Sequence, residues 1–207
     1  MQSSPPENLY MALIHYPVYD KNYREVASCI TNLDLHDLAR CAATFGVKRF
    51  YVATPMAPQR DYALKLTAHW TEGMGGRYNP SRKQALESIR IVGELEDVIQ
   101  EVEKEWGREP MLVATGAKGG EDTISHNSLR KNLFDHSKEI PYIIVFGTGW
   151  GLAKAVTQRA DYMLEPIRGV YEFNHLSVRC AAAITLDRLT ETASVTNENI
   201  ISSSGSD

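Results

Sequence analysis

The sequence predicts an α/β protein with a mostly parallel sheet and helices on both faces. Short apolar runs of strand length alternate along the whole chain with longer segments of helical periodicity. The run Tyr142–Phe146 is continuously apolar, which is typical of a strand that is buried on both faces. Several of the runs end in glycine-containing loops, and each loop leads toward a helical segment.

Each element of this fold has its own local signal. The expected strands are Leu9–His15, Arg49–Ala53, Ile89–Val92, Met111–Ala114, Tyr142–Phe146 and Tyr162–Leu164. The expected helices are the segments Asp34–Phe45, Pro55–Thr71, Ser81–Ser88, Glu94–Trp106, Ser128–Phe134 and a final helix that ends near Glu191. We expect a loop at Glu72–Pro80, which is rich in glycine, and either a short strand or a helical turn at Val26–Thr31.

Capping residues indicate where some of these helices begin and end. Asp34 is the expected N-cap of the first helix, and Gly46 is expected to stop it. Glu94–Trp106 has apolar residues at helical spacing and acidic residues on the other face. Either Asn174 or Ser177 can cap the last helix.

Length and composition indicate a cytosolic protein with one folded domain. With 207 residues and 43% hydrophobic content, the chain suits a single domain at 9–191, a flexible lead-in at 1–8 and a disordered tail at 192–207. No apolar run is long enough to span a membrane, and no signal peptide is recognisable. The cysteines, Cys29, Cys41 and Cys180, are expected to be reduced core thiols, and no metal-ligand spacing is present.

Three glycine-bearing loops follow expected strands, and they are the candidate ligand site. They begin at Thr115, at Gly147 and at Glu165. Such loops can line a pocket with backbone amides and carbonyls for a small flat ligand, although each alone is also compatible with an ordinary turn. The spacing in FGTGWG matches neither a dinucleotide fingerprint nor a phosphate-binding loop that ends in Gly-Lys-Ser/Thr.

Three segments in order carry a resemblance to a known family. They are TNLDLHDLARCAATFG, FGTGWGLAKAV and MLEPIRGVYEFNHLSVRCAAAI. Together they resemble the SPOUT class of RNA methyltransferases over nearly the whole length, from Leu9 to Leu189. The likeness is closest to a small bacterial family of predicted RNA methyltransferases without a separate RNA-binding domain.

The resemblance implies a C-terminal trefoil knot that holds S-adenosylmethionine. The residues that match the cofactor loops of the class are Thr115, Gly116, Phe146, Gly147, Thr148, Gly149, Leu164, Glu165, Pro166, Ile167, Gly169, Asn174, His175, Leu176 and Ser177. It also implies an obligatory homodimer through the last helix, where Ala181, Ala182 and Ala183 would allow close approach; a core helix of a monomer is the equal alternative.

The same resemblance implies a catalytic set of Arg40, Asn174 and His175. Arg40 would lower the pKa of an attacking group or hold a phosphate, and a surface helix arginine is the alternative. One residue is inserted relative to the class, so His175 stands where 2′-O-methylating members carry Asn, and it becomes a candidate base. Glu165 could pair with Arg168 or lie near the cofactor's sulfur, although a solvated loop carboxylate is the simpler expectation.

An RNA substrate, a tRNA or an rRNA, is the implied partner, with neither a membrane nor a metal. With a net charge of −4, any RNA surface must be a local basic patch, and the acidic helix Glu94–Trp106 should face away from it. Candidate phosphate contacts are Arg77, Arg82, Lys83, Lys118, Arg130 and Lys131. The competing interpretations are a non-catalytic SPOUT-like module that binds S-adenosylmethionine or a nucleotide, and a small-molecule enzyme on a flavodoxin-like sheet.

Overall fold

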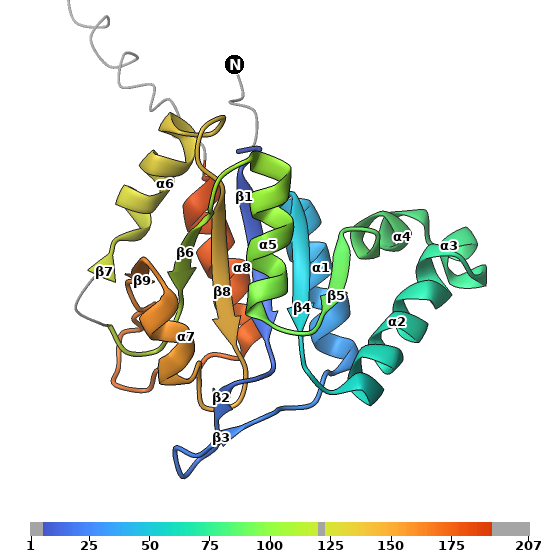
Figure 1. Ribbon diagram of the computed structural model, residues 1–207, viewed down its shortest axis with the longest axis horizontal. Helices are drawn as coiled ribbons and strands as arrows, with labels where there is room; N and C mark the ends of the chain where they lie inside the picture. Colours follow the sequence, from blue (N-terminus) through green and yellow to red (C-terminus); the bar gives the residue numbers. More distant parts are fainter. Residues whose placement is uncertain (1–5, 120–122, 192–207) are drawn as a thin grey trace, which may run out of the picture.

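A single parallel sheet forms the centre of the protein. The structure is a computed structural model that describes residues 6–119 and 123–191. Within these residues seven parallel strands form the sheet in the order β5-β4-β1-β8-β6-β9-β7 (Figure 1). Their bounds are β1 (Leu9–Ile14), β4 (Arg49–Ala53), β5 (Ile89–Val92), β6 (Met111–Ala114), β7 (Thr123–Ile124), β8 (Tyr142–Gly147) and β9 (Tyr162–Leu164). The predicted α/β class, with a parallel sheet and helices on both faces, and all six expected strands are confirmed.

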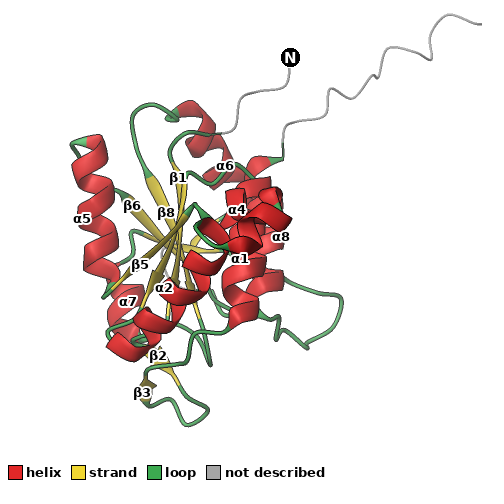
Figure 2. Ribbon diagram, turned by 90° about the vertical axis from the view of Figure 1, so that its right-hand side faces the viewer, coloured by secondary structure: helices red, strands yellow, loops and turns green. Residues whose placement is uncertain are grey.

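Helices cover both faces of the sheet (Figure 2). One face packs against α1 (Asn32–Thr44), α2 (Ala57–Thr71), α4 (Pro80–Leu86), α6 (His126–Asp135) and α8 (Val178–Thr190). The other face packs against α5 (Leu95–Trp106) and α7 (Lys154–Arg159). Strand β1 shows why its run is apolar throughout, because Met11 lies in the first core cluster and Ala12 in the second, both fully buried.

Helix ends agree with the sequence signals in part. Helix α5 begins with a capping box between Glu94 and Asp97, and Gly107 ends it with a φ of 68°. The N-cap of α1 is Thr31, whose hydroxyl accepts from the Asp34 amide at 3.1 Å, so the prediction of Asp34 as the cap is wrong. Asp34 is instead the third helical residue. Ser177 caps α8.

Several elements differ from the sequence prediction. The expected loop at Glu72–Pro80 contains a short helix, α3 (Met74–Tyr78), because its glycines pack against α2. A Cβ on Gly76 would lie 2.3 Å from the Trp70 carbonyl oxygen, so only glycine permits this packing. Helix α7, strand β7 and the hairpin of β2 (Val18–Tyr19) and β3 (Glu25–Val26) were not expected. Of the segment Val26–Thr31, for which we expected a short strand or a helical turn, only Val26 belongs to a strand, β3.

The cysteines are not core residues. Cys29 and Cys180 are exposed, and Cys41 is half-buried, so the expectation of core thiols is wrong. Residues 1–5 of the expected lead-in and the expected tail at 192–207 lie outside the described residues. Among the helices described, none is both long and apolar enough to cross a membrane. Nor do the described ranges contain a group of three or more His, Cys, Asp or Glu side chains suited to a metal ion.

Candidate functional site

The three glycine-bearing loops leave neighbouring strands at the same edge of the sheet. Ile14 pairs with Gly147 across β1 and β8, and Ala114 pairs with Val145 across β6 and β8. Ala114 also pairs with Met163 in β9, so the loops at Thr115, Thr148 and Glu165 start side by side. This is the carboxyl edge, where open α/β sheets bind ligands. The structure therefore brings the predicted cofactor loops together.

The loop that follows β8 packs against the β2–β3 hairpin. Gly149 has a φ of 59°, and a Cβ there would lie 2.8 Å from the Tyr19 carbonyl oxygen. The same oxygen accepts from the Trp150 amide at 2.9 Å. A Cβ on Gly147 would lie 2.8 Å from the amide nitrogen of Leu152. These two glycines are thus required by the packing of the protein's own backbone, a reason that the sequence did not reveal.

A partly buried hydrogen-bond chain that begins at His15 supports the same loop. His15 is fully buried, and its Nδ1 lies 2.9 Å from Oγ of Ser28. Ser28 Oγ in turn forms a short hydrogen bond with the Thr148 hydroxyl. Burial lowers the pKa of His15 from 6.5 to about 4, against the opposing charge of Asp34. His15 is therefore neutral near pH 7.

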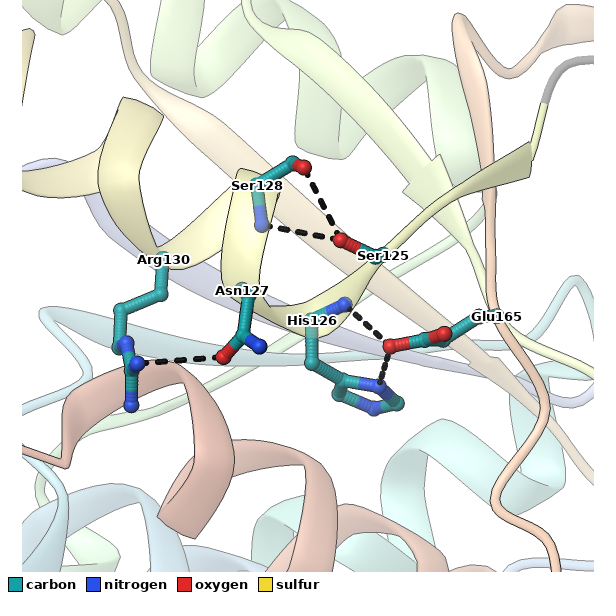
Figure 3. Close-up of polar contacts among 6 residues, drawn as sticks. All are labelled: Ser125, His126, Asn127, Ser128, Arg130 and Glu165. Atoms are coloured by element: carbon teal, nitrogen blue, oxygen red, sulfur yellow. Dashed lines mark hydrogen bonds and ion pairs between the residues drawn. The ribbon is translucent and has the colours of Figure 1, made fainter.

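The loop after β9 is attached to the start of α6 through Glu165 (Figure 3). Oε1 of Glu165 accepts from the His126 backbone amide at 2.7 Å and lies 2.9 Å from His126 Nδ1. The expectation of a solvated loop carboxylate is therefore wrong, and the ion-pair partner of Glu165 is His126 rather than the alternative, Arg168. His126 comes from a segment 39 residues earlier, so spacing alone could not reveal the pair.

The electrostatics of this pair favour a charged Glu165 and a neutral His126. The hydrogen bond from the His126 backbone amide is the main cause that lowers the pKa of Glu165. Burial lowers the pKa of His126, which is only 4% exposed, although the Glu165 hydrogen bond opposes this. Nδ1 of the neutral ring donates to the carboxylate, and Nε2 is buried without a hydrogen-bond partner among the described residues.

The remainder of the loop, from Pro166 to Ser177, lies on the surface and returns to the loop after β6. Nδ2 of Asn174 donates to the Ala117 carbonyl oxygen at 3.1 Å, which joins two of the predicted cofactor loops. His175 is exposed, and its ring lies 5.2 Å from that of Phe173. Ser177 accepts from the Cys180 amide as the cap of α8. Asn174 and Ser177 thus have structural partners in addition to their predicted roles.

A cavity of about 490 Å³ opens beside this loop. It is lined by Gly119, Thr123, Glu165, Pro166, Arg168 and Arg188. Its volume lies within the range of small-molecule sites in proteins. Of the predicted cofactor residues, only Glu165 and Pro166 line it, and Arg188 of α8 was not anticipated by any local motif.

Arg40 lies apart from this cavity. It is exposed on α1 and lines a second cleft of about 590 Å³ between α1, α2 and α4. Helix α1 is nevertheless connected to the end of the loop, because Arg179 of α8 lies 2.9 Å from Asp34 and 3.6 Å from Asp37. No contact among the described residues brings Arg40 against Asn174 or His175.

Comparison with known proteins identifies several relatives. The chain is 45% identical to a tRNA (guanine-N(1)-)-methyltransferase from Oleidesulfovibrio alaskensis over 89% of its own length and 42% of the other's. It is 38% identical to an uncharacterized protein from Aquifex aeolicus, with 88% of each chain covered. The chain thus spans about two-fifths of the length of the first relatives it matches, 42% and 43%.

Solved structures share the fold at low identity. A probable methyltransferase from Bordetella pertussis superposes with a TM-score of 0.61 at 14% identity, covering 88% of this chain and 94% of that one. The SpoU methyltransferase AviRb from Streptomyces viridochromogenes, in complex with AdoMet, superposes with a TM-score of 0.53 at 15% identity, covering 91% of this chain and 59% of that one. The family model for SAM-dependent RNA methyltransferases matches residues 8–191. Because this match covers most of the chain, the protein belongs to the SAM-dependent RNA methyltransferases.

Proposed function

We propose that this protein transfers a methyl group from S-adenosylmethionine to a nucleotide of RNA. The observation that carries the proposal is the match of residues 8–191 to a family of SAM-dependent RNA methyltransferases. The convergence of the three predicted cofactor loops at one sheet edge supports it. The similar proteins named tRNA (guanine-N(1)-)-methyltransferases make tRNA the first substrate class to test.

The residues at the sheet edge fit the chemistry of this cofactor. S-adenosylmethionine carries a carboxylate, an ammonium group and a positively charged sulfur. Arg168 and Arg188, which line the cavity, can bind the carboxylate through charge-assisted hydrogen bonds. Glu165, which lines the same cavity, supplies the opposite charge, because its lowered pKa keeps it ionised. Gly169 has no neighbouring atom within 4 Å of a built Cβ, so its backbone is open to a ligand.

The bound cofactor supplies an electrophilic methyl group, and the protein must align an RNA nucleophile with it. Methyl transfer by in-line displacement would require the protein to hold that nucleophile in line with the methyl group. His175 is exposed at the loop end and can accept the proton that the nucleophile loses. Arg40, also exposed, can hold an RNA phosphate or stabilise developing negative charge.

The trefoil knot is part of this proposal. Strand β9 lies between β6 and β7, which precede it in the chain and are joined by the loop that follows Ala114. The chain thus enters β9 from α7 on one face and leaves for α8 on the other. The segment after β9 touches that loop, since Asn174 bonds to Ala117. These contacts support threading, which is otherwise exceptionally rare in proteins.

We further propose a homodimer through α8 and a single domain at 9–191 that acts in the cytoplasm, where tRNA is available. Cys180 is exposed, and Ala181 and Ala183 are half-buried, so this side of α8 is open to a partner. Ala182 is fully buried in the core, so it takes no part in an interface. Small side chains at the two open positions would let two helices approach closely.

The test is transfer of labelled methyl groups to bulk tRNA, combined with calorimetry of S-adenosylmethionine binding. The wild-type protein should label the tRNA. His175→Ala should lower the rate at saturating S-adenosylmethionine by about 10²-fold, the lower end for general-base catalysis. The control is Lys104→Ala, a change at an exposed position of α5 away from the loop, and this variant should methylate tRNA as the wild type does.

The contrary outcomes separate the alternatives. Cofactor binding with no transfer to tRNA or rRNA would favour a non-catalytic SPOUT-like module. If S-adenosylmethionine does not bind, the remaining alternative is a small-molecule enzyme on a parallel sheet. Normal labelling by His175→Ala would refute the assignment of His175 as the base while leaving the reaction class intact.

A further inference from the structure

The second cleft, between α1, α2 and α4, is unlike the rest of the surface. Its volume is about 590 Å³, and α2 and α4, which Figure 1 shows beyond the edge strand β5, line it together with α1. The cleft combines exposed aromatic rings with cations. The residues that matter are Arg40, Tyr62, Lys65, His69, Trp70 and Arg82, all among those that line it.

Three of the aromatic rings of the cleft contact one another, and a fourth, Tyr62, is exposed beside them. Trp70 makes edge-on contacts with His36 and His69, at ring-centroid distances of 5.3 Å and 5.2 Å. The Arg82 guanidinium carbon lies 4.7 Å from the Trp70 ring centroid. Tyr62 of α2 also lines the cleft and is 43% exposed. Ordered rings at an open surface are suited to stacking on flat groups, at a low cost in conformational entropy.

The cleft is positively charged on an otherwise acidic protein. Arg40 and Lys65 are exposed cations, and Arg82 is a third. Among the described residues that line the cleft, Asp37 is the one carboxylate, and it already pairs with Arg179 at 3.6 Å. The whole chain carries a net charge of −4. A local excess of cations against that background selects a polyanion and orients its approach.

The opposite face of the sheet shows the reverse pattern. There α5, which Figure 2 shows on the side of the sheet opposite α1, carries acidic residues, while its apolar residues pack on the strands. The acidic helix and the cationic cleft thus lie on opposite faces of the sheet. A negatively charged polymer is directed to the α1 face.

We infer that this cleft binds a single-stranded segment of the RNA substrate, next to the nucleotide that reacts. Bases stack on Tyr62 and His69, and phosphates contact Lys65, Arg40 and Arg82. Phosphates alone would require only cations; the exposed rings beside them indicate unstacked bases rather than a duplex. The inference rests on the proposed function, because it assigns the RNA surface of the same reaction.

The position of the cleft is consistent with this role. It runs along α1 from Asn32 to Arg40. The Asn32 end of α1 is connected to α8 by the Arg179–Asp34 ion pair, and α8 begins directly after the loop that carries His175. One end of the cleft therefore adjoins the candidate methyl-transfer site, so a strand bound in the cleft can place a neighbouring nucleotide there.

The test measures RNA binding separately from cofactor binding and turnover. Affinity for a fluorescently labelled, mixed-sequence single-stranded RNA oligonucleotide and for bulk tRNA is measured by anisotropy at several salt concentrations. The variants are Tyr62→Ala and Lys65→Glu, both at exposed positions. The matched controls are Tyr78→Ala on α3 and Lys104→Glu on α5, which change the same residue types outside the cleft.

Tyr62→Ala should weaken RNA binding at least about fivefold, the lower limit for loss of one base–aromatic stack. Lys65→Glu should weaken it as much and reduce its salt dependence. Both controls should bind RNA as the wild type does. S-adenosylmethionine binding, measured by calorimetry, should be unchanged in all four variants, which also shows that they fold.

The outcomes distinguish this inference from the proposed function. If the wild type binds RNA through the cleft but never transfers methyl groups, the proposed function fails and the inference stands. If the wild type methylates RNA but both cleft variants bind and methylate normally, the inference is overturned. It is equally overturned if the wild type binds no RNA, or if the variants change only the oligomeric state in light scattering, since a second copy would then occupy the cleft.

Discussion

His15 makes the stability of the protein depend on pH in a defined range. Its pKa is lowered from 6.5 to about 4 because the ring is fully buried, at the carboxyl end of β1. The folded state therefore binds a proton less readily than the unfolded state. Stability from this residue is complete above about pH 6.5 and is lost as the pH falls toward 4.

The magnitude follows from the size of the pKa change. Each pKa unit corresponds to about 1.4 kcal/mol, so the neutral His15 contributes about 3 kcal/mol that disappears on acidification. The assay is urea unfolding at a series of pH values for the wild type and for His15→Asn. Asn keeps an amide donor near the Nδ1 position that faces Ser28, but it does not titrate.

Between neutral pH and pH 4, the wild type should lose about 3 kcal/mol more of its unfolding free energy than His15→Asn does. The pKa values of His36 and His126 are also lowered, mainly by burial, but their contributions are common to both proteins and cancel in the difference. Parallel stability profiles for the two proteins would refute the assignment of a buried neutral imidazole at this position.

Further predictions concern the glycine turn and the loop anchor. Gly149→Ala should lower the unfolding free energy more than Gly107→Ala, measured by urea titration, because only the former places its Cβ 2.8 Å from the Tyr19 carbonyl oxygen. Gly107→Ala should lower the unfolding free energy by only about 1–2 kcal/mol, the cost of placing a residue with a Cβ in the left-handed conformation. Equal losses of unfolding free energy in the two variants would contradict the close packing at Gly149. Glu165→Ala should cost about 1–3 kcal/mol and speed amide exchange at the start of α6, since it leaves buried His126 without its acceptor. Unchanged exchange there would show that the pair does not anchor the loop.

Patterns that repeat within a segment were predictable from the sequence. Helix α5 has regular apolar spacing and glycine at its end, so its bounds as predicted and as observed differ by one residue. Strands such as β8 are apolar throughout because helices cover both faces. Helix α3 was missed because Met-Gly-Gly has no helical signal of its own; its glycines are required by contact with α2. Two-residue strands such as β7 are too short for any periodicity.

The candidate site was predictable to the level of its loops but not of its contacts. Glycine after successive strands indicated which loops would meet at the carboxyl edge. The partner of Glu165 comes from α6, and the partner of Thr148 comes from the segment after the β2–β3 hairpin. Such pairs depend on how distant segments fold together. The cationic cleft likewise exists only once three helices are packed together.

The central claim is that the loops at the carboxyl edge hold the methyl donor. Hydrogen exchange of the full chain, with and without S-adenosylmethionine, tests it most directly. The account predicts slower amide exchange at residues 115–119, 146–149 and 164–177, with no change in α5. Protection confined to other segments, or no protection at saturating cofactor, would contradict it.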